Sequence, residues 1–139
     1  MKELTIEHVE YIAHNLAKKL MEWDEPIPDF HTRFPGKLES CLKTPLLTFD
    51  GKDLYPKLED KAAILFYLIV KNHPFQNGNQ RIAVTALLTY LYINKKWLKI
   101  HEDDLYELAV DVAKSKSIYK NGIIEIIKEI LKTHTINKS

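Results

Sequence analysis

The sequence predicts an all-α fold, a bundle of helices that carries one small β-hairpin. Apolar residues recur at helical spacing along most of the chain. The stretch from Leu58 to Lys71 is nearly all apolar between its charged ends, which predicts a helix buried on most sides, and a second strongly apolar stretch begins near Asn79. These two helices are expected to form the core pair. The turn signal Asp50-Gly51 lies between two short apolar runs and indicates a hairpin.

Length and composition predict one domain that spans residues 1–139. Of the 139 residues, 45% are hydrophobic and 28% are charged, which is enough for one core and too little for two ordinary domains. The formal net charge of +1 argues against direct nucleic-acid binding. A single cysteine, Cys41, excludes an intramolecular disulfide, and no stretch has transmembrane length or the character of a signal peptide. We therefore expect a cytoplasmic protein that makes no membrane contact.

The first helix is predicted to follow Thr5, because apolar residues recur there at helical spacing, namely Val9, Ile12, Ala13, Leu16 and Leu20. Residues 23–36 contain three prolines and Gly36, which exclude a regular helix and predict an irregular connection. A short helix is predicted from Lys37 to Lys43.

The predicted hairpin runs from Leu46 to Tyr55, between two prolines. The helix that begins at Leu58 is acidic at its start and basic at its end, as the helix dipole favours, and His73-Pro74 ends it. The helix after Asn79 has a broad apolar face, made of Ile82, Ala83, Ala86, Leu87, Tyr90 and Leu91. Two more helices are predicted, one with Leu105, Leu108, Ala109 and Val112, the other opened by Asn121, and the tail from Thr133 is expected to fray.

The stretch from His73 to Arg81, His-Pro-Phe-Gln-Asn-Gly-Asn-Gln-Arg, lies between the two most hydrophobic helices. The start of a helix leaves unpaired N–H groups and a partial positive charge, so a loop with Gly78 at this position can bind phosphate oxygens. Arg81 in the first turn adds a forked cation that matches phosphate geometry. His73, at the end of the preceding helix, is a candidate general base.

The other residues of the stretch allow more than one interpretation. Asn77 and Asn79 can hold a metal-bound phosphate or cap the helix, and Phe75 is predicted to anchor the loop in the core. On spacing alone, a loop histidine, a proline stop and an asparagine cap also fit a helical hairpin without chemistry. The other five histidines have no metal-ligand spacing and are expected at the surface, namely His8, His14, His31, His101 and His134.

The stretch HPFQNGNQR, residues 73–81, resembles the signature of the Fic/Doc (Fido) family, which reads His-x-Phe-x-acidic-Gly/Ala-Asn-Gly/Lys-Arg. The flanking stretches GKLESCLKTP, DLYPKLEDKAAILFYLIVKNHPF and RIAVTALLTYLYIN are similar to those of death-on-curing (Doc) type toxins of toxin–antitoxin systems. The resemblance covers about residues 35–94. It implies a Fic/Doc-type helical bundle in which the hairpin forms a flap.

The resemblance implies roles for individual residues. The family's motif histidine accepts the proton of a target-protein hydroxyl that attacks a nucleotide phosphate, and His73 occupies its position. The phosphate pocket falls on Gly78, Asn79, Gln80 and Arg81. ATP or another nucleoside triphosphate is the implied co-substrate, with Mg²⁺ as the candidate metal and Asn77 as its weak ligand. The target segment is expected to add as a strand to the flap, through Leu46, Leu47, Thr48, Phe49, Leu54 and Tyr55.

Three positions depart from the family pattern. Asn77 replaces the acidic residue that holds magnesium, and a neutral carbonyl binds a hard cation more weakly. Gln80 replaces the glycine of nucleotidyl-transferring Fic enzymes and the lysine of Doc, and its side chain obstructs the close phosphate approach that glycine permits. Val84 replaces the second arginine of nucleotidyl-transferring enzymes. AMP transfer is therefore disfavoured.

The nearest match to the family's self-inhibitory helix, Ser117 to Gly122, has Asn121 in place of the glutamate. Inhibition is therefore expected from a separate antitoxin protein whose flexible tail folds on binding. The leading hypothesis is a Doc-like toxin that phosphorylates a hydroxyl of a translation factor, with elongation factor Tu as the candidate target. The alternatives are AMP (nucleotidyl) transfer, a non-catalytic binding module, and a helix-turn-helix reader of DNA, which the neutral charge opposes.

Overall fold

The N-terminal segment forms one helix with a π-helical turn in its middle. The computed structural model describes residues 1–20 and 26–138. Within the first range, α1 (Ile6–His8), a π-helical turn (Val9–Ala13) and α2 (His14–Lys19) follow one another without a break, which confirms the predicted first helix. The Thr5 hydroxyl accepts a hydrogen bond from the backbone N–H of His8, and the His8 ring accepts one from the N–H of Thr5. This reciprocal cap fixes the start of the helix.

The connection from Pro26 to Gly36 is irregular apart from a 3₁₀ turn at Phe30–Thr32, and residues 23–25 of the predicted connection lie outside the described residues. Gly36 has a left-handed backbone (φ 84°) and precedes α3 (Lys37–Lys43), whose bounds match the prediction. A 3₁₀ turn at Thr44–Leu46 then leads into the hairpin.

The predicted hairpin is confirmed. Strands β1 (Thr48–Phe49) and β2 (Lys52–Asp53) pair antiparallel, with Thr48 opposite Asp53. Asp50 and Gly51 both have positive φ, 53° and 77°. A tight two-residue turn of the hairpin-favouring type requires positive φ at both central positions, and Asp-Gly is a preferred pair there.

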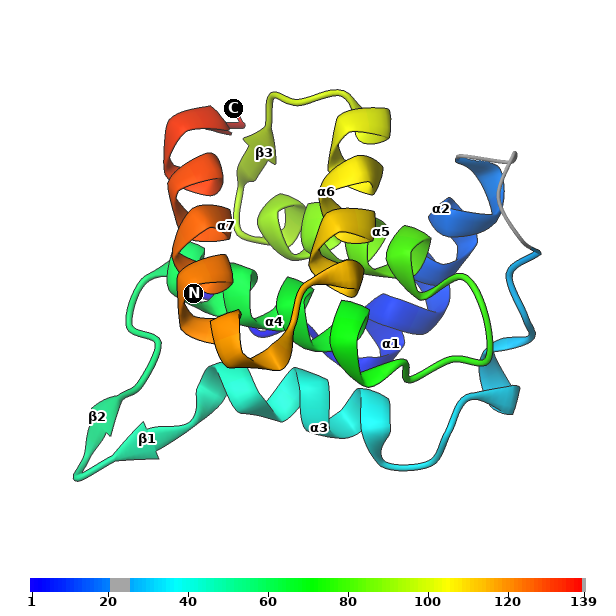
Figure 1. The fold of residues 1–139 in the computed structure, drawn as a ribbon, viewed down its shortest axis with the longest axis horizontal. Helices are drawn as coiled ribbons and strands as arrows, with labels where there is room; N and C mark the ends of the chain where they lie inside the picture. The colour runs from blue at the N-terminus through cyan, green and yellow to red at the C-terminus, as the bar shows by residue number, and fades with distance from the viewer. Residues whose placement is uncertain (21–25, 139) are drawn as a thin grey trace.

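Helices α4 (Leu58–Asn72) and α5 (Asn79–Ile93) form the centre of the fold. Residues 61–67, 69 and 70 of α4 are buried, which confirms the helix predicted to be buried on most sides. Every residue from 81 to 91 is buried too, so α5 is buried beyond its predicted broad apolar face. Helices α6 (Glu102–Lys114) and α7 (Lys120–His134) pack against this pair, and a 3₁₀ turn at Ser117–Tyr119 joins them. In Figure 1, α3 lies on one side of the central pair, and α6 and α7 lie on the other. The observed fold is therefore the predicted helical bundle.

The C-terminal tail departs from the prediction. Instead of fraying, Thr135–Asn137 forms β4, which pairs antiparallel with β3 (Lys96–Leu98). Lys95 has a positive φ of 62°, which turns the chain after α5 and presents the edge of β3 to the tail. Backbone pairing on this edge outweighs the tendency of a chain end to fray. None of the helices in the described parts of the chain is long and apolar enough to cross a membrane.

Candidate active-site loop

The loop between α4 and α5 begins and ends with a left-handed residue. His73 ends α4 with φ 48° and ψ 63°, and Gly78 precedes α5 with φ 73° and ψ 17°. Pro74 disfavours a helical backbone at His73, so the chain must leave α4 at this point. A left-handed residue other than glycine is uncommon, although histidine adopts this conformation more readily than most. The tight turn leaves the His73 side chain exposed to solvent.

The Asn79 side chain closes the loop on itself. Its Oδ1 accepts a hydrogen bond from the N–H of Phe75 at 2.9 Å, and its Nδ2 donates to the carbonyl of Phe75 at 2.8 Å. Asn79 is 4% exposed, and Phe75 is 1% exposed within the core. Both polar groups of the Asn79 amide therefore bind the loop's own backbone, and this pair of bonds fixes the path of residues 75–79.

Gly78 is favoured by its backbone angle, and its neighbour Ile27 would have to move to make room for a side chain there. A Cβ placed on Gly78 would come within 2.5 Å of Cδ1 of Ile27, a distance that real Cβ atoms essentially never show. The positive φ also strains any residue with a side chain. Ile27, which sequence reasoning did not single out, therefore belongs to the surroundings of the loop.

Arg81 lies under the loop rather than on it. The residue is 3% exposed, and its Nη2 donates hydrogen bonds to the carbonyls of Ala17 and Leu20, the latter at 2.9 Å. The last carbonyls of a helix have no partner within the helix and carry a partial negative charge. The guanidinium satisfies these carbonyls at the end of α2. In this arrangement its charge serves the packing of α2 against α5.

The predicted site residues thus fall into two groups. Phe75, Gly78, Asn79 and Arg81 are buried and build the loop, whereas His73, Asn77 and, in part, Gln80 are exposed to solvent. The second group is the one that can contact a ligand directly. The first turn of α5 begins beside these exposed residues, and such a turn presents backbone N–H groups that favour anions.

A second segment packs against the loop, and we call residues 26–34 the clasp segment. The N–H of Phe34 donates to the carbonyl of Pro74 at 2.9 Å, and Nε2 of Gln76 donates to the carbonyl of Thr32 at 3.4 Å. The Phe30 ring lies 5.8 Å from the Phe75 ring, centre to centre. Together with the contact between Ile27 and Gly78, these interactions hold the clasp segment along the loop.

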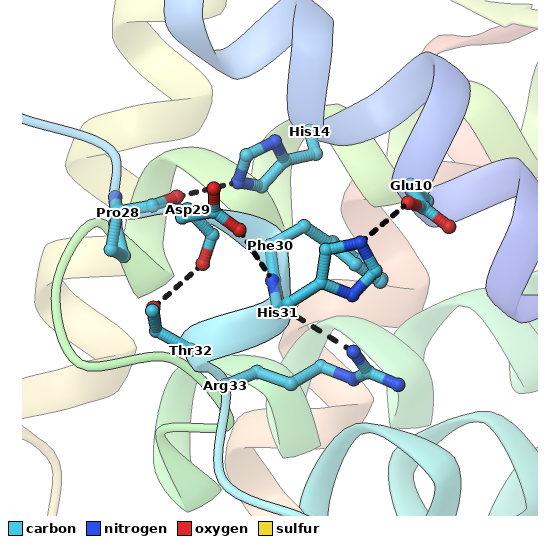
Figure 2. A network of polar contacts seen from close by, with 8 residues as sticks. All are labelled: Glu10, His14, Pro28, Asp29, Phe30, His31, Thr32 and Arg33. Carbon is cyan, nitrogen blue, oxygen red and sulfur yellow. Dashed lines mark hydrogen bonds and ion pairs between the residues drawn. The ribbon is translucent and has the colours of Figure 1, made fainter.

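Polar contacts tie the clasp segment to the N-terminal helix (Figure 2). His14 Nε2 lies 2.8 Å from the carbonyl oxygen of Pro28, and Nε2 of His31 lies 3.3 Å from Oε2 of Glu10. Within the segment, Asp29 accepts a hydrogen bond from the N–H of His31 at 2.8 Å, and the hydroxyl of Thr32 donates to the carbonyl of Asp29 at 2.6 Å. The 3₁₀ turn is therefore held by the N-terminal helix and by hydrogen bonds within the clasp segment itself.

The prediction that His14 lies at the surface is wrong. His14 is 2% exposed, and burial lowers the pKa of its imidazole below the usual value of 6.5, although the hydrogen bond to Pro28 acts in the opposite direction. The sequence feature that could have indicated this burial is its position three residues before Ala17, which is buried too. His31 and His101 are exposed as expected, and His8 and His134 are partly buried. Among residues 1–20 and 26–138, no group of three or more His, Cys, Asp or Glu can hold a metal ion.

The hairpin lies at the opposite end of α4 from His73 (Figure 1). Helix α4 has 15 residues and is therefore about 22 Å long. The hairpin's apolar side chains point into solvent, with Phe49 75% exposed and Leu54 50% exposed. Lys61, in the first turns of α4, is 6% exposed and contacts both ends of the hairpin. Its ammonium donates a hydrogen bond to the carbonyl of Pro45 at 3.0 Å and forms an ion pair with the carboxylate of Asp53 at 3.7 Å.

Comparisons with known proteins point to the same family as the sequence of the loop. Residues 3–91 match the Fic/DOC family. Toxin Doc of Mycolicibacterium smegmatis (strain ATCC 700084 / mc(2)155) is 42% identical to this chain over 59 residues, which cover 42% of this chain and 45% of the toxin. The match thus spans less than half of that relative's length. No solved structure matches the chain.

Proposed function

The chain belongs to the Fic/DOC family, and on this basis we propose that it is a Doc-like toxin that transfers a phosphate from a nucleoside triphosphate to a hydroxyl of a protein target. The observation that carries the proposal is the position of His73. Its exposed imidazole follows a left-handed turn at the end of α4, and only the short loop from Pro74 to Gly78 separates it from the anion-favouring start of α5.

The proposed reaction requires little more than a base and a phosphate cradle. His73 accepts the proton of the target hydroxyl, the hydroxyl oxygen forms a bond to the terminal phosphorus, and the bond to the bridging oxygen breaks to release the nucleoside diphosphate. The backbone N–H groups at the start of α5 bind the phosphate oxygens, with Gln80 at their edge. Catalysis of this kind depends mostly on positioning, which a loop closed by Asn79 and backed by Arg81 supplies.

Two residues favour terminal phosphate transfer over AMP transfer. Val84 is 0% exposed within α5, so the position that carries a second arginine in nucleotidyl-transferring enzymes offers no charge to a nucleotide. The Gln80 side chain occupies the place where such enzymes have glycine. ATP would therefore be bound with its outermost phosphate, rather than its innermost one, opposite His73.

The residues of the loop do not fit a resident magnesium ion. Magnesium in phosphoryl-transfer sites is usually held by one or two carboxylates together with substrate phosphates. The loop contains no carboxylate, only neutral amides such as that of Asn77, and the described residues contain no cluster of metal-ligating side chains. Mg²⁺ is therefore assigned to the substrate, as the nucleotide's own counter-ion.

The proposed partners follow from the geometry of the hairpin and from the family. A target segment that adds to the edge of β1 or β2 would also have to extend along the roughly 22 Å length of α4, at least about seven extended residues, to reach His73. Such a target has a long flexible segment that carries the acceptor hydroxyl. A translation factor such as elongation factor Tu is the candidate target, a separate antitoxin is the candidate inhibitor, and both place the reaction in the cytoplasm.

The proposal is tested by incubating the purified chain with ATP, magnesium and a translation extract, followed by peptide mass spectrometry. A phosphate on a target hydroxyl that is lost with His73→Ala supports the proposal. His101→Ala is the matched control, because His101 is also exposed but lies at the start of α6. An adenylyl group lost with His73→Ala would instead establish nucleotidyl transfer, and no modification at all would favour a non-catalytic binding module.

A further inference from the structure

His14 joins three parts of the molecule that meet behind the candidate active-site loop. It belongs to α2, its ring centre lies 5.9 Å from that of Phe75 in the loop, and it lies 5.5 Å from that of Phe30 in the clasp segment. Since the Pro28 carbonyl can only accept, Nε2 of His14 must carry the hydrogen in their 2.8 Å contact. One buried side chain thus contacts the clasp segment through a hydrogen bond and the loop through its ring.

A second polar contact between the clasp segment and the N-terminal helix lies largely at the surface. The ion pair between His31 and Glu10 involves a His31 side chain that is 75% exposed, and exposed pairs contribute little. The clasp segment in turn contacts the loop at Pro74, Phe75, Gln76 and Gly78. The hydrogen bond from His14 is therefore a polar contact, made by a buried side chain, between the helix and the segment that lies along the loop.

We propose that His14 is a positioning residue for the reaction: its hydrogen bond to Pro28 and its ring contact with Phe75 press the clasp segment onto the loop and hold His73 and the start of α5 in one arrangement. The effect on turnover rests on the proposed function, whereas the effect on loop order does not. Burial keeps the imidazole neutral at physiological pH, which suits a ring that donates through Nε2 alone, although Glu10 and Asp29 nearby favour the charged form and Lys18 opposes it.

Two substitutions separate positioning from simple packing. Glutamine can place a donating N–H close to the position of the histidine Nε2, so His14→Gln is expected to keep the bond to Pro28. Leucine fills a similar volume but leaves the Pro28 carbonyl without this donor, so His14→Leu keeps the packing and removes the bond. His31→Gln, in the same segment, removes the exposed ion pair with Glu10 and an edge contact of the His31 ring with Phe30, leaves the bond from His14 to Pro28 in place, and serves as the control.

The experiment is hydrogen–deuterium exchange of the intact chain, read at the amides of residues 75–79 and of Phe34, at a temperature where all variants are folded. His14→Leu is expected to raise exchange at these amides about ten-fold, as the loss of about one net hydrogen bond implies. His14→Gln and His31→Gln are expected to stay within about two-fold of the wild type. Where target phosphorylation is measurable, kcat is expected to fall by a similar factor with His14→Leu and to recover with His14→Gln.

Unchanged exchange at the loop amides of folded His14→Leu would overturn the inference, and so would an unchanged kcat in a variant whose loop exchange has risen. Raised loop exchange in a chain whose wild type transfers no phosphate supports the effect on loop order and counts only against the proposed function. Should His14→Leu not fold, Phe30→Leu tests the same contact from the clasp segment, because it removes the ring facing Phe75 and keeps an apolar side chain. It is expected to raise exchange at the same amides, and unchanged exchange there would count against the inference.

Discussion

The contact between Gly78 and Ile27 gives a prediction whose magnitude can be worked from the structure. Gly78→Ala places a methyl group on a residue with φ 73°, which costs about 1 kcal/mol of backbone strain. The same methyl group would lie 2.5 Å from Cδ1 of Ile27, which ends a flexible side chain that can turn aside, so the added cost falls at the low end of overpacking, about 1 kcal/mol. We expect the free energy of unfolding to fall by about 2 kcal/mol in total.

Ile27→Val isolates the second contribution, because valine lacks the one atom that clashes. Alone, this substitution is expected to cost about 0.5–1.5 kcal/mol. In its presence, Gly78→Ala should cost only about 1 kcal/mol, the strain of the backbone. The assay is urea unfolding of the wild type, the two single variants and the double variant, from which the interaction energy is obtained. An equal cost of Gly78→Ala in both backgrounds would refute the reasoning, because it would mean that Ile27 does not restrict this position.

Three further predictions concern other buried groups. Asn79→Ala removes both hydrogen bonds to Phe75 and leaves buried backbone groups unpaired. Urea unfolding should therefore show a loss of about 2–4 kcal/mol in the free energy of unfolding. A loss below about 1 kcal/mol would mean that the loop does not depend on these bonds. Because burial lowers the pKa of His14 below 6.5, the unfolded chain binds a proton first as pH falls, so the contribution of His14 to stability is complete above pH 6.5 and is lost as pH falls below it. Thermal unfolding across this range should show a smaller pH dependence for His14→Gln than for the wild type, and equal dependence would contradict the assignment. Cys41 is fully buried and its thiol pKa is raised to about 11, so a thiol reagent at pH 8 should label it only after unfolding; rapid labelling of the folded chain would contradict its burial.

The parts of the fold that the sequence predicted are those in which local pattern and tertiary packing agree. The two central helices are so uniformly apolar that any compact arrangement must bury them, and their starts and ends are marked by Pro74 and Gly78. The hairpin followed from Asp50-Gly51, because both residues accept the positive φ that its turn requires. The bounds of α3 followed from Gly36 before it and from the prolines on both sides.

The parts that the sequence did not predict depend on contacts between distant segments. Strand β4 exists because Lys95 turns the chain so that β3 offers it an edge, and no pattern in the tail itself signals a strand. His14 is buried by a clasp segment that has no periodicity of its own. The bonds of Arg81 to carbonyls at the end of α2 also join distant segments, and the phosphate binding that the family signature implies for this residue stays a prediction. A guanidinium suits either acceptor, and sequence cannot tell which one is nearest.

The central claim is that His73 directs the terminal phosphate of a nucleotide to a protein hydroxyl. The most direct measurement uses two preparations of ATP, one labelled at the terminal phosphate and one at the innermost phosphate, with wild type, His73→Ala and a translation extract. We predict that only the terminal label reaches a protein of the extract, and only with His73 present. Transfer of the innermost label, or transfer of the terminal label that persists in His73→Ala, would contradict it.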